Sequence, residues 1–144
     1  MNTPPPRYYE YFGRTFKIEW TADGRRGWLL NLDTGEFDPA NGPISKVVGA
    51  TSDSDICTLT EADFIEETEI LRAYTLTGEG PIFELYDTID ALFAQKDAEN
   101  RRFTDQERAL IRSLRRRTFA MWEDELARRA AGEPPGFSVR RGNV

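Results

Sequence analysis

Apolar and polar residues alternate along the first third of the chain. In residues 16–20 every second residue is apolar and those between are charged, a period of two that is typical of a half-buried strand. Residues 27–32 predict a second strand, and residues 22–26 supply the turn between the two. Pairing Trp20 with Trp28 would bring the apolar residues of both strands onto one face, so we expect a turn with an odd number of residues.

A second turn follows at residues 33–36. If Leu32 faces Phe37, this loop has four residues and is built around a type I turn, with Gly35 free to adopt a positive φ. The pattern therefore predicts an antiparallel meander of three strands. Residues 44–48 can add a fourth strand.

Beyond residue 60 the apolar period changes to that of a helix. Thr60 and Asp63 have the spacing of a capping box, which predicts a helix as far as about Arg72. Between residues 82 and 93 apolar residues recur at intervals of three, four and seven, so we expect a second, amphipathic helix that begins at Pro81.

The longest predicted helix covers about residues 105–131. Thr104 and Glu107 form a full capping box at its start, and Gly132 with the two prolines after it marks its end. Arginines recur at spacings of four, three and four along this helix, which places them on one helical face. These residues, the Arg stripe, are candidates for binding a nucleic-acid backbone: Arg108, Arg112, Arg115 and Arg116.

Together these elements predict an α+β fold, with an N-terminal antiparallel β-meander of three to four strands packed on about three C-terminal helices. A chain of 144 residues fits one domain with one core. We expect an extended Pro/aromatic arm at residues 1–13, a single α+β domain at residues 14–132 and a flexible C-terminal tail at residues 133–144.

The residue inventory excludes several kinds of chemistry. The chain has no histidine, which removes the imidazole-dependent catalytic triads and most zinc sites. Its one cysteine, Cys57, rules out an intrachain disulfide and suits a reducing compartment. No signal peptide or membrane-spanning run is evident. We therefore expect a cytoplasmic protein that is not an enzyme, holds no cofactor or metal, and does not enter a membrane.

One motif is instead typical of an enzyme. An apolar run that ends in Asp33-Thr34-Gly35 resembles the way aspartic peptidases present a catalytic carboxylate. Those enzymes need two such carboxylates that share a proton, so a chain with one copy would have to dimerise. The following residue, Glu36, would place another negative charge beside the two carboxylates and disturb their titration. An ordinary hairpin turn also explains the Asp33-Thr34-Gly35 sequence.

The formal net charge of −6 is unevenly distributed. The balance is 0 over residues 1–50, −11 over residues 51–99 and +5 over residues 100–144. Carboxylates concentrated on helices would attract a basic protein surface, although such a surface is also typical of highly soluble proteins. We name six of them the acidic-helix residues: Glu66, Glu67, Glu69, Glu84, Asp87 and Asp90.

The N-terminal arm is the other candidate for protein contact. Its prolines favour an extended conformation, and the aromatic residues after them need a surface to lie on, either in the same domain or on a partner. The candidate contact residues of the arm are Tyr8, Tyr9, Tyr11 and Phe12.

We therefore expect a non-enzymatic protein-binding protein of the bacterial cytoplasm, in the manner of an immunity, inhibitor or adaptor protein. It would bind a protein with a basic surface through the acidic-helix residues, the arm or both. The alternative is a nucleic-acid-associated regulator that uses the Arg stripe. A second alternative is a dimeric hydrolase that depends on Asp33.

Overall fold

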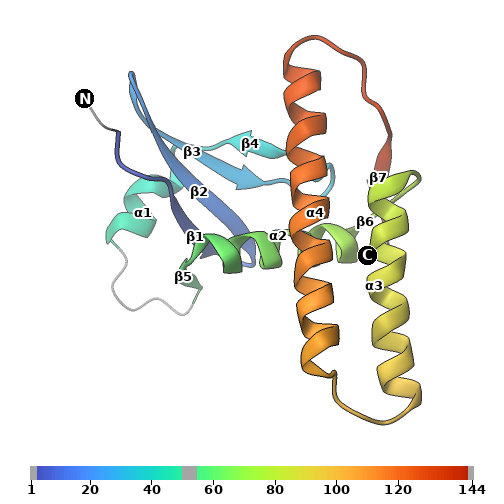
Figure 1. Cartoon of the computed structure of the whole chain (residues 1–144). Coiled ribbons are helices and arrows are strands. Elements are labelled where there is room, and N and C mark those ends of the chain that lie inside the picture. Colours follow the sequence, from blue (N-terminus) through green and yellow to red (C-terminus); the bar gives the residue numbers. More distant parts are fainter. Residues whose placement is uncertain (1–2, 50–54, 143–144) are drawn as a thin grey trace. The chain divides into compact units, whose positions relative to one another are not determined.

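The computed structural model describes residues 3–49 and 55–142, and it confirms the α+β class (Figure 1). The chain divides into two compact units, Met1–Arg72 and Ala73–Val144. We predicted one core, but the buried apolar residues described form two clusters, one in each unit. Each unit is therefore described by itself.

The first unit contains a five-stranded antiparallel sheet with the strand order β4-β3-β2-β1-β5. The order differs from a simple meander because the last strand returns to pair with the first. The strands are β1 (Arg7–Tyr11), β2 (Arg14–Thr21), β3 (Gly24–Leu30), β4 (Phe37–Pro39) and β5 (Ile56–Leu59).

Residues 7–11, which we predicted to be part of an extended arm, form β1 between β2 and β5. The chain turns directly into β2 through Phe12 and Gly13, both of which have positive φ, as a two-residue hairpin turn with right-handed strand twist requires. Tyr9 and Tyr11 consequently point into the core of this unit.

The predicted register between β2 and β3 is wrong. Thr21 pairs with Gly24 across a two-residue turn, so Ile18 faces Gly27 and Trp20 faces Arg25. A side chain at Gly27 would require the backbone to shift, because a Cβ atom would lie 2.2 Å from the Ala40 carbonyl oxygen and 2.7 Å from the Phe16 ring. The apolar residues that we placed on one face are therefore divided between two.

Both faces of the sheet are covered, which explains this division. The neighbouring residues Thr15 and Phe16 point to opposite faces, and both are fully buried. Phe16 lies in a cluster with Ile44 and Val47, two buried residues of α1 (Pro43–Gly49). On the other face the Thr15 hydroxyl hydrogen-bonds that of Thr68 in the next helix, with 2.8 Å between the oxygens.

Two further local predictions are corrected. Residues 44–48, expected as a fourth strand, lie in α1. The loop before β4 has six residues, because β3 ends at Leu30, which pairs with Phe37. Gly35 has a φ of 79°, so the predicted positive φ is confirmed.

Most of the helix α2 (Glu61–Thr75) belongs to this unit, and its predicted start is confirmed. The Thr60 hydroxyl oxygen accepts a hydrogen bond from the Asp63 backbone N–H at 3.1 Å. Phe64 is buried against the sheet, with its ring stacked on that of Phe37 at a centroid distance of 5.5 Å.

The second unit is built on two long helices that lie side by side, α3 (Pro81–Ala98) and α4 (Asp105–Ala130) (Figure 1). Pro81 occupies the predicted first position of α3. The capping box of α4 is also confirmed, because Thr104 and Glu107 exchange hydrogen bonds of 3.1 and 2.9 Å. A two-stranded sheet of β6 (Leu76–Gly78) and β7 (Val139–Arg141) completes the unit.

We name residues 133–142 the strap. We predicted a flexible tail from residue 133, whereas the structure shows these residues on a defined course back from the end of α4 to β6. Phe137 and Val139 of the strap pack on the buried cluster of the second unit. Part of the expected tail is thus an element of the fold.

Candidate functional site

The exposed carboxylates of α3 form one charged surface of the second unit. Glu84, Asp87 and Asp90 are all exposed, and we name them the acidic face. Within the described part of the chain, none of the three makes a salt bridge. Partial burial and the neighbouring charge of Asp87 raise the pKa of Asp90, while Arg115 of α4 acts against this rise. Negative charge on this face is therefore only partly balanced.

The other three acidic-helix residues, all on α2, are less accessible than we expected. Glu69 is 1% exposed and pairs with Arg72 at 2.9 Å. Arg72 also donates from Nε to the carbonyl oxygen of Gly35 at 2.9 Å, so this ion pair joins α2 to the loop before β4. Glu66 and Glu67 are half-buried. Glu69 is therefore part of the interior and cannot contact a partner.

The arm residues are similarly divided. Tyr9 and Tyr11 are buried, and the Tyr8 hydroxyl donates to the Glu61 carboxylate at 2.8 Å. Phe12 is 51% exposed because it sits at the tip of the β1–β2 turn. The structure therefore does not gather these four side chains into one contact surface.

The Arg stripe lies along α4, partly engaged by neighbouring groups. Arg108 pairs with Asp105 and donates to the carbonyl oxygen of Phe103 at 2.9 Å. The Arg115 guanidinium lies 6.0 Å from the centre of the Phe93 ring, so an aromatic residue does flank the stripe. Arg112 and Arg116 are exposed. The Arg stripe and the carboxylates of α3 lie close enough within this unit for Arg115 to lower the pKa of Asp90.

Asp33 lies in the loop between β3 and β4, and it is exposed. Its backbone N–H donates to the side-chain oxygen of Asn31 at 2.8 Å, and the Gly35 N–H donates to the Asn31 carbonyl at 2.8 Å. These bonds are those of a tight turn. The geometry of the motif is thus explained by the hairpin.

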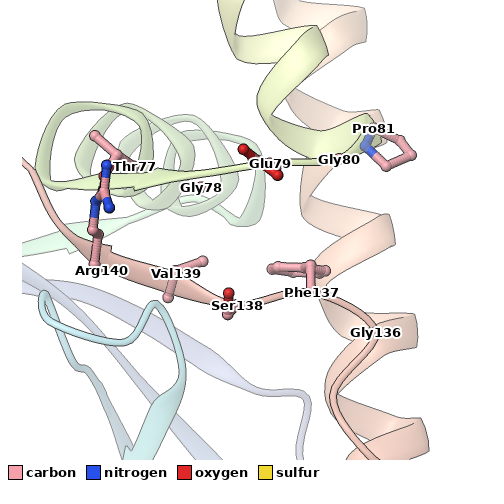
Figure 2. A pocket seen from close by; sticks show the side chains of 10 residues that line it. All are labelled: Thr77, Gly78, Glu79, Gly80, Pro81, Gly136, Phe137, Ser138, Val139 and Arg140. Atoms are coloured by element: carbon pink, nitrogen blue, oxygen red, sulfur yellow. The ribbon is translucent and has the colours of Figure 1, made fainter.

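A hollow of about 810 Å³ lies between residues 77–81 and 136–140. Figure 2 shows the two segments side by side, with the Arg140 side chain directed toward Thr77. Arg140 donates from Nε to the Thr77 hydroxyl at 3.2 Å. Three glycines line the hollow, so much of its wall is backbone. Among residues 3–49 and 55–142, no group of three or more carboxylate or cysteine side chains could hold a metal ion.

The sequence reasoning missed a polar centre beneath the strap. Glu125 is 2% exposed and accepts hydrogen bonds from the Gly136 N–H at 2.7 Å, Arg129 Nε at 2.7 Å and Arg128 Nη2 at 3.0 Å. The Gly136 bond, followed by the two arginines, lowers the Glu125 pKa to about 2, although burial opposes this shift. In the sequence, the only sign of these ion pairs was that Arg128 and Arg129 follow Glu125 by three and four residues, which places them on the same helical face.

This centre predicts a defined acid dependence. The folded-state pKa of Glu125 lies below its ordinary value of 4.5, so its contribution to stability is present above about pH 4.5 and is lost as the pH falls toward 2. Glu125→Gln should therefore flatten the dependence of unfolding free energy on pH in this window, as measured by urea titrations at several pH values. An unchanged pH dependence would show that the carboxylate is not held in this way.

Comparison of the chain with protein-family models, curated proteins and solved structures found no match. In the parts of the chain that are described, no helix has both the length and the apolar character needed to cross a bilayer.

Proposed function

We propose that this protein is a non-enzymatic binding protein whose acidic face, on α3, docks on a basic surface of another protein. One observation carries the proposal: Glu84, Asp87 and Asp90 project from one rigid helix without a salt bridge in the described structure. The arm and α2 contribute less than expected, since Tyr9, Tyr11 and Glu69 are buried.

The raised pKa of Asp90 supports this proposal physically. A raised carboxylate pKa means that the charged form is disfavoured, here by burial and by Asp87. A lysine or arginine from a partner, placed between these two side chains, would favour the charged form and gain binding energy. Negative charge concentrated on one surface would also speed the encounter with a basic protein.

Nucleic acid is the less supported partner. Arg108 is held by Asp105, and Arg115 lies close enough to Asp90 to influence its pKa. A phosphate backbone approaching Arg115 would therefore meet the acidic face as well, and the chain as a whole is negative.

Neutralising the acidic face should remove binding. The variant Glu84→Gln/Asp87→Asn/Asp90→Asn is expected to lose, by tenfold or more, the proteins that the immobilised wild type retains from a cell extract at low salt. The matched control neutralises three other exposed carboxylates and changes the net charge equally: Glu123→Gln, Asp124→Asn and Glu133→Gln. It should retain those proteins.

Circular dichroism would establish that both variants are folded. Equal losses in the two variants would mean that net charge alone causes retention. Undiminished retention by the acidic-face variant would contradict the proposed surface. Retention of nucleic acid in place of protein, falling steeply with salt, would favour the Arg stripe.

A further inference from the structure

We infer that the outer edge of β5, in the first unit, binds an extended and basic segment of another protein, which joins the sheet as an added strand. β5 stands at one end of the strand order β4-β3-β2-β1-β5, and among the described residues it pairs with β1 alone. The acidic face lies on α3 in the second unit, so this inference does not rest on the proposed function.

The pairing with β1 decides which backbone groups of β5 face outward. The Phe12 N–H donates to the Asp55 carbonyl oxygen at 2.8 Å, which sets the alternation of the antiparallel ladder. The N–H and C=O groups of Cys57, two residues further on, therefore face β1, whereas those of Ile56 and Thr58 face away from it. A row of such outward groups is a template for another strand.

Other strand edges of this protein carry features that discourage strand addition. β4, at the opposite end of the sheet, has three residues, of which Asp38 is charged and Pro39 cannot donate a hydrogen bond. β7 contains two arginines. The sequence of β5 is Ile-Cys-Thr-Leu, with no charged residue, proline or glycine. Its edge is therefore suited to pairing.

The apolar side chains of β5 are incompletely covered. Ile56 and Leu59 are both half-buried, and since they lie three residues apart in a strand, they point to opposite faces of the sheet. Ile56 packs against the buried cluster of this unit. A strand beside β5 would cover more of both side chains, which adds apolar burial to the backbone hydrogen bonds.

The charges around β5 indicate a basic partner. The charged residues just before and after the strand are exposed carboxylates: Asp55, Glu61 and Asp63. On β1, Glu10 lies opposite Cys57 and makes no salt bridge within the part of the chain that the structure describes. Because Cys57 is small, a lysine or arginine beside it on the added strand can extend across it toward Glu10, over two strand spacings or about 10 Å.

Amide hydrogen exchange of the protein alone gives the first test. The outward N–H groups of Ile56 and Thr58 should exchange tenfold or more faster than the inward groups of Cys57 and Leu59, as measured by NMR. Exchange that is equally slow at all four residues would show that another part of the chain already covers this edge, and it would overturn the inference.

A synthetic strand gives the second test. The probe is acetyl-Thr-Val-Thr-Lys-Thr-Val-Thr-amide, which should slow exchange at Ile56 and Thr58 by tenfold or more. The same peptide with glutamate in place of lysine should bind several-fold more weakly, and Glu10→Gln should reduce this difference. No protection by the lysine peptide at up to about 1 mM, or equal binding of the two peptides, would contradict the proposed partner.

Variants of Thr58 locate the binding. Thr58→Pro removes the outward N–H and leaves the hydrogen bonds to β1, so it should weaken peptide binding by tenfold or more with an unchanged circular dichroism spectrum. Thr58→Lys keeps the N–H but repels the basic peptide, so it should weaken binding several-fold even if the proline variant is unstable. Thr58→Val is the matched control and should bind as wild type does.

The two binding surfaces can be tested separately. The variant that neutralises the acidic face of α3 should bind the peptide as wild type does, because β5 belongs to the other unit. Undiminished binding by folded Thr58→Pro and Thr58→Lys would place the peptide elsewhere on the protein and overturn the inference, whatever the outcome for the acidic face.

Discussion

Glu69→Gln is expected to lower the free energy of unfolding by about 3 to 5 kcal/mol, because removing one partner from a buried ion pair leaves an uncompensated charge inside the protein. The Glu69 carboxylate lies 2.9 Å from Arg72, and neither side chain has solvent exposure. Arg72 also lies 5.4 Å from the centre of the Phe37 ring, so the guanidinium cannot reach water without disturbing that contact. A urea titration would measure the loss.

The control replaces both charges. Glu69→Leu/Arg72→Met fills a similar volume with apolar groups, and such replacements often cost little or stabilise a protein. The double variant should therefore unfold with a free energy closer to wild type than Glu69→Gln, even though the Gly35 carbonyl loses its Arg72 donor. A single variant within about 1 kcal/mol of wild type would mean that the pair has access to solvent.

Trp122→Ala has the second large expected effect. Trp122 is fully buried, its ring contacts Phe137, and its Nε1 donates to the Tyr86 hydroxyl at 2.9 Å. Removing a large aromatic side chain from a core costs about 3 to 5 kcal/mol. Because the strap rests on this ring, the variant should also release it, which limited proteolysis in residues 131–136 would detect.

Trp122→Phe separates the two roles of this side chain. It keeps a ring against Phe137 but removes the donor to Tyr86, so the expected cost is about 1 to 3 kcal/mol, with the strap still protected. Strong cleavage in Trp122→Phe, equal to that in Trp122→Ala, would show that the hydrogen bond and not ring packing holds the strap.

Helix starts were predictable from the sequence, because they depend on local chemistry. Thr104 and Glu107 satisfy each other's backbone N–H groups three residues apart, and Pro81 needs no donor at a first helical position. Neither feature requires knowledge of distant residues.

The sheet was less predictable, because its register depends on what covers it. Alternating apolar residues indicate one buried face, but Thr15 and Phe16 show that both are buried. The Phe12-Gly13 turn also joins an apparent arm to the sheet, although Phe is an unusual residue at positive φ. The register and the two buried faces of the sheet depend on contacts with helices that are distant in the sequence.

Only part of the candidate site could be predicted from the sequence. On α3 the acidic positions lie opposite the apolar stripe, and periodicity alone placed them on the surface. On α2, Glu69 and Arg72 lie on the buried side with Phe64 and Thr68. Charged residues three apart on an apolar face were the available signal of an internal pair.

The pairing of β1 with β5 has a consequence for synthesis of the chain. Tyr8 pairs with Leu59 and Tyr11 with Ile56, so the sheet closes only after the ribosome has released residue 59. These distant contacts slow closure. The unit nevertheless ends at Arg72 and has a buried cluster of its own, so it can fold before the last helix, α4, is complete.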